Sequence, residues 1–101
     1  MNNTKWTEIF KALYYGAELC GGPAVPWTTR SLEGFVYSDN TWTHFGVGLE
    51  KDAREIDWLK IWLTPENREY VLDTLRKIHV PGEVLADCVM VYGHRMDVDY
   101  I

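Results

Sequence analysis

Three histidines and two cysteines are the side chains of this chain best suited to hold a metal ion: Cys20, His44, His79, Cys88 and His94. Zinc sites combine thiolate and imidazole ligands at short spacings, such as two cysteines separated by two residues. These five residues show no such spacing, and they fall in five different segments of the chain. The sequence therefore predicts no metal and no cofactor. Two isolated cysteines in a chain of this kind are typically reduced and buried, although one disulfide between them stays open.

Nucleophilic catalysis would require a cysteine beside a base, and Cys20 with His44 is the pair to consider, because such partners need only be close in space. Cys20 follows a predicted helix, whereas helix N-termini are the ends that lower a thiol pKa. The carboxylates lie in polar stretches, where a solvated surface is the default. Gly21-Gly22 is followed by Pro23 and by no Lys-Ser or Lys-Thr pair, which excludes a phosphate loop. We therefore expect a protein that is not an enzyme.

Aromatic side chains give the sharper signal, because the chain has five Trp and six Tyr among 101 residues. Trp58 and Trp62 flank Lys60 on one side of a predicted strand. If helices cover the opposite, aliphatic side, these three residues lie on the open face of the sheet, and Trp42 can join them from a neighbouring hairpin. Large, rigid aromatic side chains are typical anchors of protein interfaces. The alternative is that the tryptophans pack in the core, under the loops or the N-terminal segment.

Charge points to the kind of partner. The formal net charge is −5, and an acidic surface repels nucleic acids and anionic membranes but attracts basic proteins. Acidic side chains near the aromatic ones would steer such a partner. We therefore predict a partner-binding surface made of Trp42, Asp52, Glu55, Asp57, Trp58, Lys60, Trp62, Asp97 and Asp99.

The elements that must position this surface are clearest between residues 55 and 82. Residues 55–63 alternate with a period of two and are rich in aromatic and aliphatic side chains, which predicts a strand. Thr64 suits the N-cap of a helix and Pro65 its first position. Apolar residues then recur at helical spacing up to Ile78, and Pro81-Gly82 ends the helix.

The rest of the chain completes an α+β pattern. We expect a first helix over Thr4–Leu19 capped by Asn3 or Thr4, a loop over Cys20–Pro26, a short edge strand over Trp27–Arg30, a hairpin of Glu33–Ser38 with Thr41–Val47 around Asp39-Asn40, an interior strand over Cys88–Tyr92 and an edge strand over Met96–Ile101. The length implies a single domain, residues 1–101. This order predicts a mostly antiparallel sheet of four or five strands with two helices packed on one face.

No apolar run approaches the length of a membrane span, and the first ten residues lack the apolar region of a signal peptide. We therefore expect a cytoplasmic protein that binds neither membrane nor nucleic acid.

Three stretches carry a resemblance: Asn2–Trp6, Asp57–Ile61 and Ile78–Gly82. They are similar to a family of small, functionally uncharacterised bacterial proteins that open with NNTKW. Because these motifs are a helix start, a strand and a helix stop, no functional residue is carried over. In size, acidity and α+β pattern the chain also resembles immunity proteins of bacterial contact-dependent growth inhibition and type VI toxin systems, at the level of the class.

These observations predict an immunity protein, an antitoxin of an interbacterial competition system that binds and occludes a basic protein toxin, a nuclease domain. Two alternatives stay open. One is a phage-type inhibitor of a host defence nuclease, which would use the same electrostatics. The other is a small ligand-binding domain or enzyme with a pocket lined by Trp, His44 and Cys20.

Overall fold

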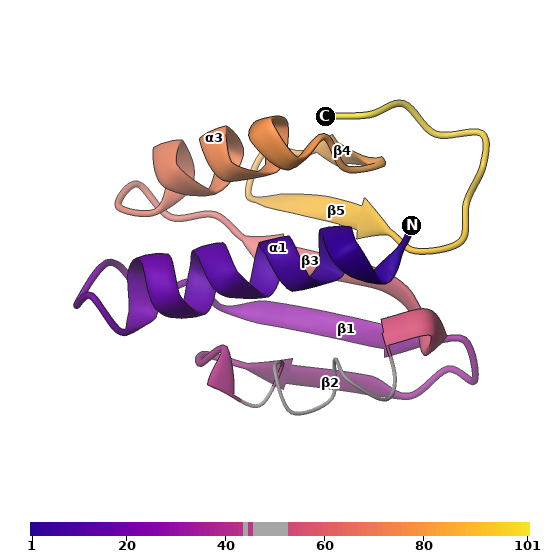
Figure 1. Cartoon of the computed structure of the whole chain (residues 1–101), viewed down its shortest axis with the longest axis horizontal. Coiled ribbons are helices and arrows are strands. Elements are labelled where there is room, and N and C mark those ends of the chain that lie inside the picture. The colour runs from indigo at the N-terminus through magenta and orange to yellow at the C-terminus, as the bar shows by residue number, and fades with distance from the viewer. Residues whose placement is uncertain (44, 46–52) are drawn as a thin grey trace.

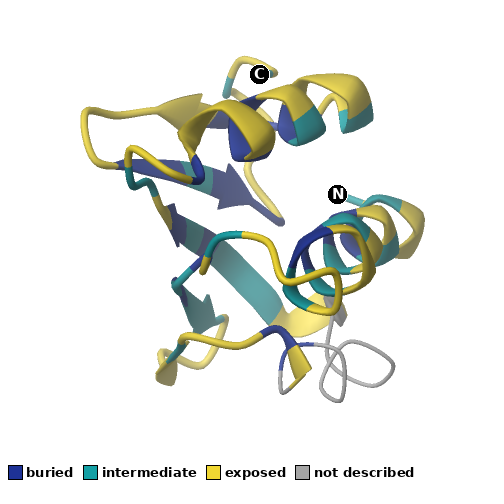
Figure 2. Cartoon of the chain, turned by 90° about the vertical axis from the view of Figure 1, so that its left-hand side faces the viewer, coloured by how far each residue is buried: buried dark blue, intermediate teal, exposed yellow. Residues whose placement is uncertain are grey.

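The computed structural model describes residues 1–43, 45 and 53–101. Its described part forms an α+β fold with a five-stranded antiparallel sheet in the order β2-β1-β3-β5-β4. The two long helices lie on one side of this sheet (Figures 1 and 2). The strands are β1 (Trp27–Ser31), β2 (Val36–Asp39), β3 (Ile56–Trp62), β4 (Gly82–Val84) and β5 (Cys88–Tyr92), and the helices are α1 (Asn3–Leu13) and α3 (Arg68–Ile78).

The core lies between the sheet and the helices. Leu59 and Ile61 of β3 stand opposite Val91 and Val89 of β5, and all four are fully buried. Burying one such side chain contributes about 1.5–3 kcal/mol. The helices supply the other side of this layer with Trp6, Ile9, Leu13, Val71, Leu72 and Leu75. The strand period of two therefore leaves the alternate residues of β3 and β5 on the face that the helices do not cover.

The first helical segment runs over residues 3–18, close to the predicted Thr4–Leu19, but it changes pitch along its length. Its N-cap is Asn2, not Asn3 or Thr4, because the Asn2 Oδ1 accepts from the Lys5 amide at 3.0 Å. The α-helix ends at Leu13, and a π-helical turn follows over Tyr14–Glu18. The Tyr70 hydroxyl donates to the Ala12 carbonyl at 2.8 Å, which is the oxygen that residue 16 would use in a regular α-helix. This contact from α3 accompanies the change of pitch.

The predicted hairpin around Asp39-Asn40 is wrong. β2 pairs with β1 instead, so that β1 is an interior strand and not an edge. The turn between them contains Gly34 at φ 96, a conformation that favours glycine. After β2, the Asp39 Oδ1 accepts from the amides of Asn40 and Thr41, a local side-chain turn that ends the strand. Thr43 and Phe45 are helical, and residues 44, 46 and 47 lie outside the described part of the chain.

The start of α3 is built by two reciprocal bonds rather than by Pro65. The Asn67 amide donates to the Thr64 Oγ1 at 3.1 Å, and the Thr64 amide donates to the Asn67 Oδ1 at 2.9 Å. This is a capping box with asparagine as its second member. The fully buried Asn67 also donates to the carbonyls of Ala24 and Trp62. One asparagine thus joins the loop before β1, the end of β3 and the start of α3.

The region after α3 contains a strand that the sequence did not predict. His79 takes the left-handed conformation at φ 64 and ends the helix. Gly82 begins β4, a three-residue edge strand beside β5. The tail predicted as an edge strand over Met96–Ile101 makes only an isolated bridge, between Pro81 and Tyr100. In the described part of the chain, no helix reaches the length and apolarity that a bilayer crossing requires.

Candidate functional site

The face of the sheet opposite the helices carries the candidate site, and we call it the open face (Figure 2). The structure places Trp58, Lys60 and Trp62 there, since they alternate with the buried Leu59 and Ile61. Sequence alternation alone was sufficient to place these three residues together.

Lys60 lies between the two tryptophans and contacts both rings. Its Nζ is 4.9 Å from the Trp62 ring centroid and 5.8 Å from that of Trp58. The Trp62 Nε1 donates to the Thr28 Oγ1 at 3.3 Å, and the side chain is 36% exposed. Each cation–π contact at an exposed site contributes about 0.5–1 kcal/mol. The Trp58–Lys60–Trp62 ladder is therefore a partly ordered surface, which lowers the entropy that binding would cost.

Beyond the ladder, the open face continues onto β5, where Cys88 and Tyr92 are buried. The Tyr92 hydroxyl donates to the Glu83 Oε2 at 3.2 Å, and the Arg95 guanidinium lies 4.4 Å from the Tyr92 ring centroid. Burial, and then the Glu83 carboxylate, raise the pKa of Tyr92. Burial also raises the pKa of the Cys88 thiol, with Asp87 as the next cause. A raised thiol pKa disfavours the thiolate, so Cys88 is not activated as a nucleophile.

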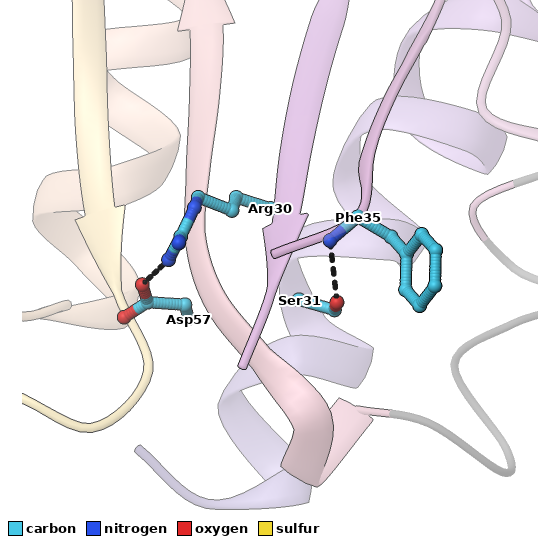
Figure 3. A network of polar contacts seen from close by, with 4 residues as sticks. All are labelled: Arg30, Ser31, Phe35 and Asp57. Carbon is cyan, nitrogen blue, oxygen red and sulfur yellow. Dashed lines mark hydrogen bonds and ion pairs between the residues drawn. The ribbon is translucent and has the colours of Figure 1, made fainter. Parts of the chain in front are cut away.

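Asp57 is held by an ion pair with Arg30, 2.7 Å between Nη1 and Oδ2 (Figure 3). Arg30 pairs with Trp58 but Ser31 pairs with Ile56, so Asp57 is the extra residue of a bulge in β3. Because of the bulge, Asp57 is out of phase with Leu59 although it lies two residues before it. Its carboxylate is matched by a cation within the chain, which weakens its role in steering a basic partner.

Trp42 does not belong to the open face, and its predicted place there is wrong. The side chain is 1% exposed, and its Nε1 donates to the Val25 carbonyl at 2.9 Å. Its ring packs against Trp27 and Phe45. The cause is the missing hairpin: residue 42 is not in a strand, and its amide donates to the Glu18 Oε1 at 2.8 Å. This bond to Glu18, at the end of the first helical segment, holds Trp42 in the core.

The other predicted acidic residues are dispersed. Glu55 is exposed in the 3₁₀ turn Ala53–Glu55 before β3, and Asp97 and Asp99 are exposed on the C-terminal tail. Asp52 lies outside the described residues. Among the described residues, no hydrogen bond or ion pair joins these carboxylates to the ladder, whose own charge is the cation of Lys60. These acidic side chains therefore lie around the open face and not at its centre.

The residues considered for metal or nucleophilic chemistry do not gather in the described part of the chain. Cys20 is exposed and donates from Sγ to the Tyr15 carbonyl, whereas Cys88 is buried, and both are free thiols. His79 stacks on Tyr100, and the His94 Nε2 lies 2.6 Å from the Arg54 carbonyl. The described residues contain no group of three metal-ligating side chains. His44 lies outside them, so the described residues do not test the alternative of a Cys20–His44 pair.

A hollow at one end of the ladder was missed by sequence reasoning. It is shallow, with a volume of about 560 Å³, and its lining residues come from β1, β2 and β3 and the segments that flank them. Trp62 contributes its exposed edge, while Thr28 and Ser38 share a hydroxyl hydrogen bond of 2.7 Å. The Thr28–Ser38 pair exists only because β2 pairs with β1. A sequence reading that paired β2 with residues 41–47 could not find this hollow.

Comparisons of the chain with protein-family models, with curated proteins and with solved structures found no match.

Proposed function

We propose that this chain is a cytoplasmic immunity protein that binds a basic protein toxin, a nuclease domain, and occludes its active-site cleft. The observation that supports the proposal most directly is the Trp58–Lys60–Trp62 ladder on the face of the sheet that no described helix covers. Large aromatic side chains that are partly exposed on one strand are the residue types that anchor protein interfaces.

The charge distribution supports a basic partner. The net charge of −5 attracts a cationic surface over a distance of about one Debye length, ~8 Å at physiological salt. Glu55, Asp97 and Asp99 are exposed and lie outside the strands. They suit the outer part of an interface, where charges act on the association rate more than on the lifetime of the complex.

The mechanism is exclusion of the substrate. A cleft that binds nucleic acid is lined with cations, and the carboxylates that hold catalytic metal ions lie at its floor. The ladder would pack its two indole rings against the apolar parts of that cleft, and the Lys60 ammonium would approach a carboxylate. Nucleic acid could not enter while the ladder occupies the cleft.

Co-expression tests the proposal. The chain is expressed with each toxin encoded beside its gene, and growth and complex formation are measured. Trp62→Ala is compared with Tyr15→Ala, because Tyr15 is also an exposed aromatic side chain and lies on the π-helical turn, outside the ladder. We expect the chain and Tyr15→Ala to protect the cell and Trp62→Ala to lose protection while its circular dichroism is unchanged. Absence of a neutralised toxin, or full protection by Trp62→Ala, would remove the proposal.

A further inference from the structure

The outer edge of β2 presents backbone groups that have no hydrogen-bond partner among the described residues. The Ser31 amide donates to the Phe35 carbonyl at 2.9 Å, and Thr29 stands opposite Tyr37. In an antiparallel pair the hydrogen-bonded positions alternate, so residues 35, 37 and 39 direct their amides and carbonyls to β1. Val36 and Ser38 therefore direct theirs away from the sheet.

The side chains of this edge are exposed and apolar. Phe35 is 74% exposed, Val36 60% and Tyr37 51%. Edge strands that avoid pairing carry lysine, proline or a bulge in the strand itself. β2 has the sequence Val-Tyr-Ser-Asp, without lysine or proline, and its pairing with β1 is regular over four positions. Its single charged residue, Asp39, is at the end of the strand, so the central residues Val36 to Ser38 carry no charge that opposes the addition of another strand.

We propose that the outer edge of β2 receives an extended segment of the basic partner, which adds to the sheet as a sixth, antiparallel strand. This inference rests on the proposed function, and it assigns to that function a second contact beside the ladder. The added strand would exchange hydrogen bonds with the amides and carbonyls of Val36 and Ser38. Strand addition obtains its affinity from such main-chain bonds and its specificity from alternate side chains.

Charge decides between a foreign strand and a second copy of this chain. The β1–β2 hairpin has one cation, Arg30, which is engaged by Asp57, and Glu33 lies exposed in the turn. A second copy would bring a body of charge −5 against another of charge −5. The best complement is a segment with β-branched residues at its centre and lysine or arginine at its ends. Its centre would pack beside the apolar strand, and its ends would be attracted by the acidic surroundings.

The added strand would lie next to the site already described. Val36 and Ser38 are opposite Arg30 and Thr28, which in turn are opposite Trp58 and Lys60. Side chains of the new strand that stand beside Ser38 would thus border the hollow lined by Thr28 and Trp62. One partner can contact the edge and the ladder at once.

A designed peptide tests the edge without knowledge of the toxin. The probe is acetylated and amidated Lys-Thr-Val-Thr-Val-Thr-Lys. Its controls are the same peptide with glutamate at both ends and one that is N-methylated at every interior residue, which blocks both edges of the peptide. We expect shifts in ¹H–¹⁵N spectra confined to β2 and its turn, and slower exchange of the Val36 and Ser38 amides. Both effects should be reduced with the glutamate peptide and lost with the N-methylated one.

Two variants complete the test. Val36→Pro removes one outward donor without removing a bond to β1, whereas Val36→Thr keeps the donor and suits a strand. The proposal is supported if Val36→Pro loses peptide binding and Val36→Thr keeps it. It is overturned if the N-methylated peptide binds equally, if no peptide shifts β2, or if light scattering shows a dimer that Val36→Pro dissociates. A toxin neutralised equally by Val36→Pro would overturn strand addition and leave the proposed function intact.

Discussion

The two edge strands of the sheet, β2 and β4, differ in whether other parts of the described chain hydrogen-bond to their outer side. At the β4 edge, the Gly82 amide donates to the Asp99 carbonyl at 3.0 Å and the Ile101 amide donates to the Val80 carbonyl at 2.9 Å. The tail therefore lies beside the start of β4, a strand of only three residues, near the C-terminus in Figure 1. At the β2 edge, no such bond to the outward groups of Val36 and Ser38 exists in the described part of the chain.

The covered edge also joins distant parts of the sequence. Tyr100 stacks on His79 with ring centroids 4.8 Å apart, and the Lys5 Nζ is 5.0 Å from the Tyr100 centroid. Lys5 also donates to the His79 carbonyl. The start of α1, the end of α3 and the tail thus meet beside β4. Several contacts thus join the β4 edge to other parts of the chain, whereas the β2 edge leaves apolar side chains exposed. We infer that the β4 edge is structural and that the β2 edge is available for binding.

The largest effect should come from Gly82→Ala, within the covered edge. A Cβ at residue 82 would overlap the Met90 carbonyl, a backbone atom that cannot move aside cheaply. We expect a loss of about 3 kcal/mol in the free energy of unfolding, measured with urea. Gly34→Ala, in the turn before β2, should cost only about 1–2 kcal/mol, because its φ of 96 is unfavourable for alanine although there is space for the methyl group. Equal losses at the two glycines would show that the edges are packed alike.

Tyr100→Ala should have the next largest effect, a loss of about 1 kcal/mol in unfolding free energy. The variant removes the stacking on His79 and the cation–π contact with Lys5. Hydrogen exchange of the Gly82 amide should become faster, since the tail that accepts its bond is released. Tyr37→Ala is the matched change at the other edge and should leave the Gly82 amide unaffected. Unchanged exchange in Tyr100→Ala would mean that the tail does not protect β4.

The sequence predicted those elements whose signal is local. Residues 56–62 form a strand and residues 68–78 a helix because alternation and helical spacing each come from one face that packs on the core. The failures involve pairing between segments. The Asp39-Asn40 pair suits a hairpin, yet β2 pairs with β1 because the turn at Gly34 makes that connection. β4 has three residues, too few to show any period.

The candidate site follows the same rule. Trp58, Lys60 and Trp62 share one strand, so their common face could be predicted from spacing alone. The position of Trp42 depended on the hairpin that does not form, and it is in the core. Asp57 is out of phase with Leu59 because of a bulge, which depends on the register with Ser31 and cannot be predicted from one strand alone. The outward direction of the Val36 and Ser38 amides and carbonyls could likewise be predicted only with the register between β1 and β2 known.

Alkaline pH should weaken the covered edge more than the open one. Burial raises the pKa values of Cys88 and Tyr92 above 9.0 and 10.0, and both residues stand on β5 beside β4. Their neutral forms are favoured in the folded state, so their stabilising effect is complete below those unfolded-state values and is lost as pH rises through the folded-state values. The pKa of Tyr37 is raised chiefly by its hydrogen bond with Asp39, but this side chain is exposed and should contribute little.

Urea unfolding followed from about pH 8 to pH 11 measures this effect. Tyr92→Phe should flatten the alkaline loss of stability, because the ring is kept and the ionisable hydroxyl is removed. Tyr37→Phe is the control at the β2 edge and should leave the slope unchanged. If only Tyr37→Phe flattened the alkaline loss of stability, the loss would originate at the β2 edge, and the predicted difference between the two edges would be wrong.

The smallest effect on stability, and the most informative for function, should come from Val36→Lys. The side chain is 60% exposed, and such surface changes typically alter the unfolding free energy by less than about 0.5 kcal/mol. A lysine on the edge opposes strand pairing and would repel the lysine-flanked peptide, so binding measured by NMR titration should be lost. Val84→Lys makes the same change on β4, where the side chain is 40% exposed, and should leave binding intact. Equal loss of binding in both variants would mean that the peptide responds to net charge, and the two edges would then not differ in function.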